Sequence, residues 1–144
     1  MMKVKIKKLH EDAILPTQQH EGDVGLDLHT IDEGVLQPNE RKLFRTGLAF
    51  QPERGYEIQI RPRSGLALKH GITVLNAPAT IEPTYRGDVG IILYNAGDKP
   101  FTVRKGDRIA QAVFKRYEEK IDIEVVDELD DSVRGTKGFG STGV

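Results

Sequence analysis

The chain has 144 residues and a formal net charge of −1 at pH 7, which predicts one domain and no basic surplus for binding nucleic acid or an anionic membrane. It contains no cysteine, which excludes disulfides, zinc–thiolate sites, iron–sulfur clusters and a thiol nucleophile. Its apolar runs are too short to span a membrane, and its lysine-rich start lacks the apolar stretch of a secretory signal. We therefore expect a protein of the cytoplasm.

The composition favours strands over helices. The chain holds 11 Val, 12 Ile and 9 Thr against 8 Ala, with 15 Gly and 7 Pro for tight turns. Apolar residues alternate with lysines at the start, where Val4 and Ile6 predict a half-buried edge strand. Further strands are predicted over residues 24–31, 41–50, 55–61, 71–75, 88–95, 100–103, 108–117 and 120–126. At most one short helix is expected, near Ser64–Lys69 with Ser64 as its N-cap, so the pattern predicts an all-β antiparallel sandwich or barrel.

The end of the chain has a different character. Four carboxylates lie within residues 127–131, and four glycines lie among the last ten residues. This composition predicts a mobile arm over residues 127–144, following a β domain over residues 1–126.

Within the arm, Gly138–Gly143 matches the dinucleotide-binding fingerprint only formally, because neither a strand before it nor a helix after it is present. Backbone N–H groups, Ser141, Thr142 and Arg134 can nevertheless surround a polyphosphate, and Phe139 can stack on a base. The alternative is a solvated tail, although such a tail has no use for an aromatic ring.

Three internal segments could also hold a phosphorylated ligand. In Arg61–Gly65, two arginines flank a proline ahead of a Ser-Gly pair, a combination suited to anions or to an ordinary strand end. In Leu75–Asp88, an amide, a carboxylate and a phenol lie on one predicted hairpin, which suits either a nucleoside site or a polar surface turn. Asp27 lies between Leu26 and Leu28, so on a strand it should face solvent or a ligand, including Mg²⁺.

The turn Gly106–Gln111 offers Arg108 and Gln111 as further polar groups. The four histidines have no metal-binding spacing, and no Ser-His-Asp arrangement is recognisable.

The order of these segments along the chain is more specific than any one of them. The series is Gly-Leu-Asp-Leu (25–28), Arg-Pro-Arg-Ser-Gly-Leu-Ala (61–67), Asn-x5-Glu-x2-Tyr-Arg-Gly (76–87), Gly-Asp-Arg-Ile-Ala-Gln (106–111) and Arg-Gly-x-x-Gly-Phe-Gly-Ser-Thr-Gly (134–143). It resembles the five ordered motifs of the trimeric dUTP pyrophosphatases (dUTPases). The resemblance extends from about Lys3 to the last residue, and Pro62–Ala67 and Gly138–Gly143 are its most specific blocks.

The resemblance implies a jelly-roll-like β-barrel, a homotrimer with shared active sites, and Mg²⁺-dependent hydrolysis of dUTP to dUMP and pyrophosphate by water attack on the α-phosphorus. It implies catalytic roles for Glu82, Asp27 and Arg63, with Asp27 reaching through water to a Mg²⁺ that the triphosphate mainly holds. It implies uracil recognition by Asn76 and nearby backbone. The implied substrate-binding set is Arg63, Ser64, Gly65, Asn76, Thr80, Ile81, Glu82, Tyr85, Gly90, Gln111, Arg134, Phe139, Gly140, Ser141 and Thr142.

One residue departs from the family pattern. The water-activating carboxylate is usually Asp, and here it is Glu82, whose extra methylene moves the carboxylate by about 1 Å, enough to cost on the order of 10²-fold in rate if nothing compensates. Three explanations for Glu82 are open: the hairpin with Pro83 is reshaped to compensate, the enzyme is slower, or the residue was introduced deliberately. Two other functions stay open at this point: a dCTP deaminase or its bifunctional relative on the same fold, and a non-catalytic nucleotide-binding regulator.

Overall fold

All paired strands in the computed structural model, which describes residues 1–143, run antiparallel. Residue 144, the last of the predicted arm, lies outside the described residues. The strands are β1 (Val4–Lys8), β2 (Leu26–His29), β3 (Gly34–Leu36), β4 (Arg41–Arg45), β5 (Leu48–Pro52), β6 (Tyr56–Arg61), β7 (Ile72–Val74), β8 (Ala79–Ile81), β9 (Gly90–Asn95), β10 (Phe101–Val103) and β11 (Arg108–Arg116), and one helix, α1 (Ser64–His70), follows β6. Within these residues, the predicted all-β antiparallel fold with a single short helix is confirmed.

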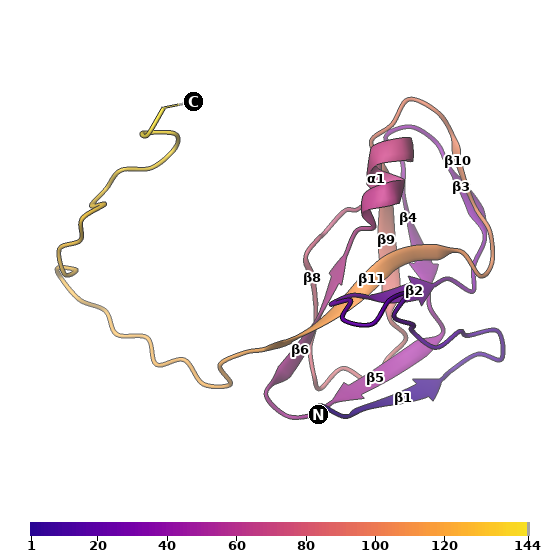
Figure 1. The fold of residues 1–144 in the computed structure, drawn as a ribbon, viewed down its shortest axis with the longest axis horizontal. Coiled ribbons are helices and arrows are strands. Elements are labelled where there is room, and N and C mark those ends of the chain that lie inside the picture. Colours follow the sequence, from indigo (N-terminus) through magenta and orange to yellow (C-terminus); the bar gives the residue numbers. More distant parts are fainter. Residues whose placement is uncertain (144) are drawn as a thin grey trace.

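The strands form four small sheets around one core (Figure 1). The largest sheet has the order β2-β11-β6-β8, and a three-stranded sheet has the order β4-β9-β7. The pairs β1-β5 and β10-β3 complete the fold. Because β11 lies between β2 and β6, it brings the segments that contain Asp27, Arg61 and Gln111 side by side.

Strand β9 illustrates how the two-residue period builds the core. Ile91, Leu93 and Asn95 point inward and are at most 1% exposed, whereas the alternate residues Ile92 and Tyr94 are half-buried. The largest fully buried apolar side chains are Phe44, Leu28, Leu36, Leu48, Ile58, Ile60, Ile72, Ile91, Leu93, Val89 and Val103. One contiguous apolar cluster therefore joins the sheets.

Two predicted strands differ from the structure, and two observed strands were not predicted. The run 41–50 is divided into β4 and β5, because Gly47 adopts φ +69°. The predicted strand over 120–126 is absent, and β11 ends at Arg116. Strands β3 and β8, of three residues each, were not predicted.

Helix α1 begins one residue earlier than expected. Arg63, not Ser64, occupies the N-cap position, and no side chain caps the first turn. Ser64 is therefore the first helical residue, and the first intrahelical hydrogen bond runs from the Ala67 N–H to the Arg63 carbonyl at 3.1 Å. The N–H groups of the first turn are left for other partners. Among residues 1–143, no helix has the length and apolar character to cross a membrane.

Asn95 is a buried polar residue that holds three backbone segments together. Its Nδ2 donates to the carbonyls of Leu36 (3.0 Å) and Lys99 (2.8 Å), and its Oδ1 accepts from the Gly97 N–H (2.9 Å). We expect Asn95→Ala to lower the free energy of unfolding by roughly 3 kcal/mol, because three backbone groups lose their partner. Urea denaturation at fixed chain concentration checks this. The exposed Gln37→Ala should change it by less than about 0.5 kcal/mol, and equal values for the two variants would contradict the prediction.

Candidate active site

Asp27 lies between two arginines. Its carboxylate is 3.4 Å from Arg63 Nε and 3.4 Å from Arg108 Nη1, and the residue is only 9% exposed. Of the two expected surroundings, solvent or a ligand, bulk solvent is not what Asp27 faces: the strand β2 turns it toward the start of α1, where the two arginines lie beside it. Arg63 also donates from Nη1 to the Arg108 carbonyl at 3.1 Å. This arrangement fixes one carboxylate and two guanidinium groups in a single cluster.

Gln111 completes this cluster from β11. It pairs in register with Asp27 on one side and Arg61 on the other, and its Nε2 donates to the Pro62 carbonyl at 2.9 Å. Gly25 is required beside it, because a Cβ at that position would overlap the Gln111 amide. Gln111 therefore links β2 to the segment that precedes α1.

A cavity of about 550 Å³ opens beside the cluster. Its lining residues are Gln59, Arg61, Pro62, Arg63, Ser64, Ala67, Ala77, Pro78 and Gln111. Guanidinium groups together with the N–H groups at the start of α1 suit an anion with several oxygens. We define the phosphate-type cluster as Asp27, Arg63, Ser64, Arg108 and Gln111.

A second cavity, of about 370 Å³, lies between β8 and β9. Its lining residues are Leu43, Thr80, Ile81, Glu82, Tyr85, Asp88, Val89, Gly90 and Ile92, none of which lines the first cavity. Leu43, which is 60% exposed, forms an apolar wall from β4. A Cβ at Gly90 would lie 2.6 Å from Leu43 Cδ1, so the Leu43 side chain packs directly over the Gly90 backbone. We call this cavity the hairpin cavity.

Leu43 and Arg108 are site-lining residues without an assigned role in the sequence motifs. Leu43 belongs to a strand that carries no motif, and only its pairing with β9 places it beside the hairpin. An exposed leucine opposite a glycine is visible in three dimensions, but it leaves no signal in the sequence alone. The sequence predicts Arg108 only as a polar group of the turn Gly106–Gln111, because its partner Asp27 lies 81 residues away.

The connection between β8 and β9 forms a tight turn that presents Glu82. The Tyr85 N–H donates to the Glu82 carbonyl at 3.0 Å, and Arg86 Nη1 donates to the Pro83 carbonyl at 2.6 Å. The Tyr85 hydroxyl donates to the Asp88 carbonyl at 2.9 Å. These bonds leave the Glu82 side chain exposed and the Tyr85 ring 45% exposed.

Asn76 lies apart from both cavities in the described chain. It occupies the connection between β7 and β8, and its side chain is exposed. Its neighbours Ala77 and Pro78 line the first cavity, and Thr80 lines the second. The connection therefore passes between the two cavities.

The C-terminal arm, which carries several residues with predicted roles, extends away from the β-fold (Figure 1). Phe139 is fully exposed. The hydrogen bonds that the structure gives for residues 120–143 stay within the arm, such as those from Ser141 N–H to Gly138 O and from Arg134 Nε to Lys137 O. Arg134, Phe139, Gly140, Ser141 and Thr142 are consequently not brought to the rest of the site within one copy.

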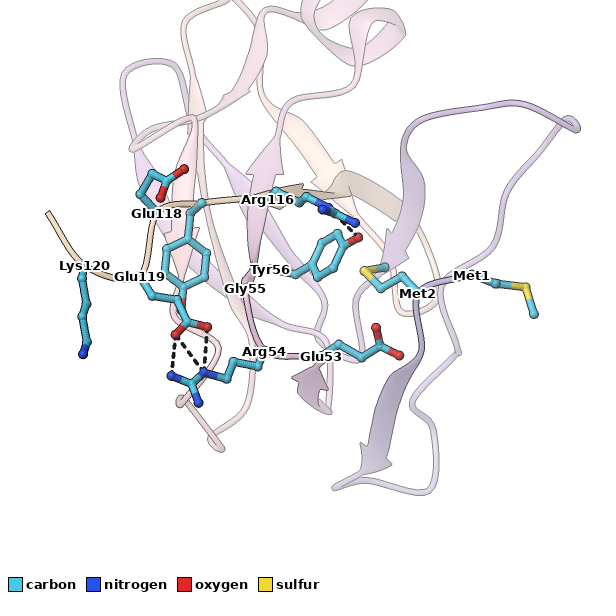
Figure 2. A pocket seen from close by; sticks show the side chains of 11 residues that line it. Met1, Met2, Glu53, Arg54, Gly55, Tyr56, Arg116, Glu118, Glu119 and Lys120 are labelled. Atoms are coloured by element: carbon cyan, nitrogen blue, oxygen red, sulfur yellow. Dashed lines mark hydrogen bonds and ion pairs between the residues drawn. The ribbon is translucent and has the colours of Figure 1, made fainter.

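The arm departs from a fixed point beside an open cavity of about 910 Å³ (Figure 2). The Tyr117 N–H donates to the Gly55 carbonyl at 3.1 Å. Arg54 then holds the Glu119 carboxylate with Nε and Nη2 at 2.7–2.9 Å, and its guanidinium lowers the pKa of that carboxyl. Arg116 stacks over the Tyr56 ring at 5.4 Å. We call Tyr117–Glu119 the arm root.

Comparison with known proteins identifies the family. The dUTPase family model matches residues 11–143. A deoxyuridine 5'-triphosphate nucleotidohydrolase of Nautilia profundicola is 54% identical over 142 residues, 99% of each chain. Its counterpart from Clostridium novyi is 54% identical over 143 residues, which cover 99% of this chain and all of that protein.

A solved structure has the same fold. A mutant of the Staphylococcus bacteriophage 80alpha dUTPase with dUpNHpp matches with a TM-score of 0.89 and 26% identity, covering 99% of each chain. The family model and the full-length relatives together cover the β-fold, both cavities and the arm. The chain belongs to the dUTPase family.

Proposed function

We propose that this protein hydrolyses dUTP to dUMP and pyrophosphate, which keeps uracil out of DNA and supplies dUMP for making dTMP. The observation that carries the proposal is the full-length match, at 54% identity, to two dUTP nucleotidohydrolases. The two cavities support it, because arginines and Ser64 line one, which suits phosphates, and a tyrosine with apolar walls lines the other, which suits a nucleoside. A dCTP deaminase lacks this support.

The phosphate-type cluster is suited to hold the triphosphate. Arg63 and Arg108 offer cations, and the N–H groups of Ser64 and Gly65 precede the first helical hydrogen bond and are free to donate. Asp27 keeps both arginines in place, because its carboxylate lies within 3.4 Å of each. Fixed donors of this kind stabilise negative charge that grows on the phosphates during the reaction.

The hairpin cavity is suited to the nucleoside. Thr80, Ile81 and Gly90 line it, and Asn76, on the connection that leads into β8, offers an amide that can both donate and accept along a base edge. Tyr85 is placed to pack against deoxyribose and to leave no room for a 2′-hydroxyl. Substrate choice then follows from sterics and from the donor–acceptor pattern of the base.

Glu82 is the proposed general base. Its exposed carboxylate takes a proton from water, whose oxygen then forms a bond to the α-phosphorus, while the bond from that phosphorus to the bridging oxygen of pyrophosphate breaks. The released electron pair stays on pyrophosphate. The turn at Pro83 and Tyr85 fixes the direction in which Glu82 leaves the hairpin.

The donor set fits a Mg²⁺ ion that arrives with the substrate. Within residues 1–143, no three His, Cys, Asp or Glu side chains converge as metal ligands. Mg²⁺ in nucleotide sites is held by substrate phosphates and one or two carboxylates, and Asp27 is the carboxylate beside the phosphate-type cluster. When bound, the ion would neutralise phosphate charge, and Asp27 would hold its water shell.

The site is proposed to form between three copies of the chain. The two cavities share no lining residue, and the arm makes no hydrogen bond to either among the described residues. Ile121, Ile123 and Val125 are each more than 75% exposed, and their alternation suits a strand that pairs with another copy. A homotrimer would unite one copy's phosphate-type cluster, a second copy's hairpin and the arm of another, with residues 127–144 closing over bound dUTP.

Pyrophosphate release tests the reaction. With Mg²⁺, we expect release from dUTP and, under the same conditions, less than about 1% of that rate from dTTP, dCTP or UTP, because a pocket built around polar groups rejects mismatched nucleotides by orders of magnitude. Ammonia release from dCTP would indicate a deaminase. Tight dUTP binding without pyrophosphate would indicate a regulator.

Mixing two inactive variants tests the shared site. Glu82→Gln and a chain ending at residue 133 each damage a different part of the site. If sites are shared, reassembled mixtures regain a fraction of activity, since some mixed trimers combine an intact hairpin with an intact arm. No regain after verified subunit exchange would place each site within one copy.

A further inference from the structure

Behind the hairpin cavity lies a buried turn that forms hydrogen bonds to a residue lining the cavity. Thr46, between β4 and β5, is fully buried. Its hydroxyl donates to the Val89 carbonyl at 2.8 Å and accepts from the Leu48 N–H at 3.2 Å. The Thr46 N–H also donates to the Val89 carbonyl, at 3.0 Å. The turn Thr46–Leu48 therefore holds Val89, the residue at the end of the hairpin, by hydrogen bonds inside the protein.

Asp88 extends this attachment to the hairpin itself. Its Oδ1 accepts from the Gly47 N–H at 2.9 Å. The peptide group between Asp88 and Val89 is held on both sides: its N–H donates to the Leu48 carbonyl at 2.9 Å, and its carbonyl accepts from the Tyr85 hydroxyl at 2.9 Å. One peptide group thus connects the buried turn to the Tyr85 side chain.

The turn is itself immobilised. The Gly47 carbonyl accepts from the Leu9 N–H at 2.8 Å. A Cβ added at Gly47 would lie 3.1 Å from Ala13 Cβ and 3.3 Å from Ile31 Cδ1, so the N-terminal loop packs closely over it. A position held by buried, satisfied hydrogen bonds is a rigid reference point for an exposed side chain.

Tyr85 needs such a reference point. Its ring is 45% exposed, and the Gly87 backbone leaves the space that its hydroxyl occupies, since a Cβ there would overlap the phenol. Without the Asp88 carbonyl, little in the described chain would fix where the ring points. A ring that excludes a 2′-hydroxyl must be held to within a fraction of an ångström.

We propose that Thr46 and Asp88 are positioning residues for the Tyr85 ring and thereby set the preference for deoxyribose over ribose: Asp88 anchors the residue whose carbonyl accepts from the Tyr85 hydroxyl, and Thr46 holds the carbonyl of the next residue, Val89. The proposal rests on the proposed function. Thr46 is fully buried and does not reach the substrate, and Asp88, although it lines the hairpin cavity, has its carboxylate bonded to the Gly47 N–H.

The test compares each truncated variant with a conservative partner. Asp88→Ala and Thr46→Val remove the bonds to Gly47 and Val89, whereas Asp88→Asn and Thr46→Ser keep an oxygen that can make them. In Asp88→Ala and Thr46→Val, we expect the ratio of kcat/KM for dUTP to that for UTP to fall roughly 3- to 10-fold, because one hydrogen bond is lost. The change should come mainly from a lower KM for UTP. The second pair should keep the wild-type ratio. A wild-type ratio in folded Asp88→Ala would overturn the proposal.

Binding without turnover separates this inference from the reaction. In a Glu82→Gln background, calorimetry with dUTP and UTP reports discrimination even if the reaction were assigned wrongly. Asp88→Ala should lower the ratio of the dissociation constant for UTP to that for dUTP by the same factor as the kcat/KM ratio. Failure of wild-type chain to release pyrophosphate would refute the proposed function alone, whereas unchanged binding discrimination in Asp88→Ala would refute the positioning role alone. Thermal melting of each variant verifies that it is folded.

Discussion

Glu82→Gln is expected to lower dUTP turnover by at least about 10²-fold, the usual contribution of a general base. The amide has nearly the shape of the carboxylate but cannot take a proton from water. The turn that presents position 82 depends on backbone bonds at Tyr85 and Pro83, so the hairpin should persist. Single-turnover pyrophosphate release and dUTP calorimetry should show slow chemistry with nearly unchanged affinity.

Glu82→Asp is the matched control, since it keeps the charge and removes one methylene. If the hairpin with Pro83 is adapted to the longer side chain, the turnover of Glu82→Asp should lie between those of wild type and Glu82→Gln, because the shorter side chain displaces the carboxylate by about 1 Å. Turnover of Glu82→Gln equal to wild type would show that another group takes the proton. Turnover of Glu82→Asp well above wild type would show that the hairpin is not adapted to Glu82.

A chain ending at residue 133 is expected to lose about 10²-fold or more in kcat/KM, because it lacks the proposed phosphate donors of the arm and the ring of Phe139. Its fold should be unaffected, since the hydrogen bonds of Arg134 and Ser141 stay within the arm. Steady-state kinetics and urea denaturation measure the two effects separately.

Two full-length variants sharpen the truncation result. Phe139→Ala should raise KM, because base stacking on an aromatic ring contributes roughly 1–3 kcal/mol. Thr136→Ala, in the same arm but without an assigned role, should behave as wild type. Full activity in the truncated chain would show that the arm is a solvated tail with no role in the reaction.

Local patterns were sufficient for much of the fold. Alternation predicted β6, β9 and β11 close to their observed bounds, because each has six or more residues with one buried face. It did not separate β4 from β5, since Gly47 bends a chain whose flanking residues all favour strands. It also placed a strand at 120–126, where the apolar residues alternate but no strand of the same copy lies beside them.

The site was predictable as a set of residues but not as an arrangement. Asp27 was expected to face solvent or a ligand, and its burial was not predictable, because Arg63 and Arg108 come from distant segments to pair with it. The position of Leu43 follows only from the pairing of β4 with β9. Where the arm binds, how many copies assemble and the cytoplasmic location stay predictions, because each depends on something outside a single copy of the chain.

For a mobile arm, the Arg54–Glu119 ion pair sets the length of the tether that carries Phe139. About 20 residues separate the arm root from Phe139, and a free chain of that length has a root-mean-square reach of roughly 25 Å and a limit near 70 Å. A ring confined to such a volume meets a site at an effective concentration in the millimolar range. Closure would therefore be an intramolecular search whose speed is independent of protein concentration, and loosening the Arg54–Glu119 pair would lengthen the tether without altering its sequence.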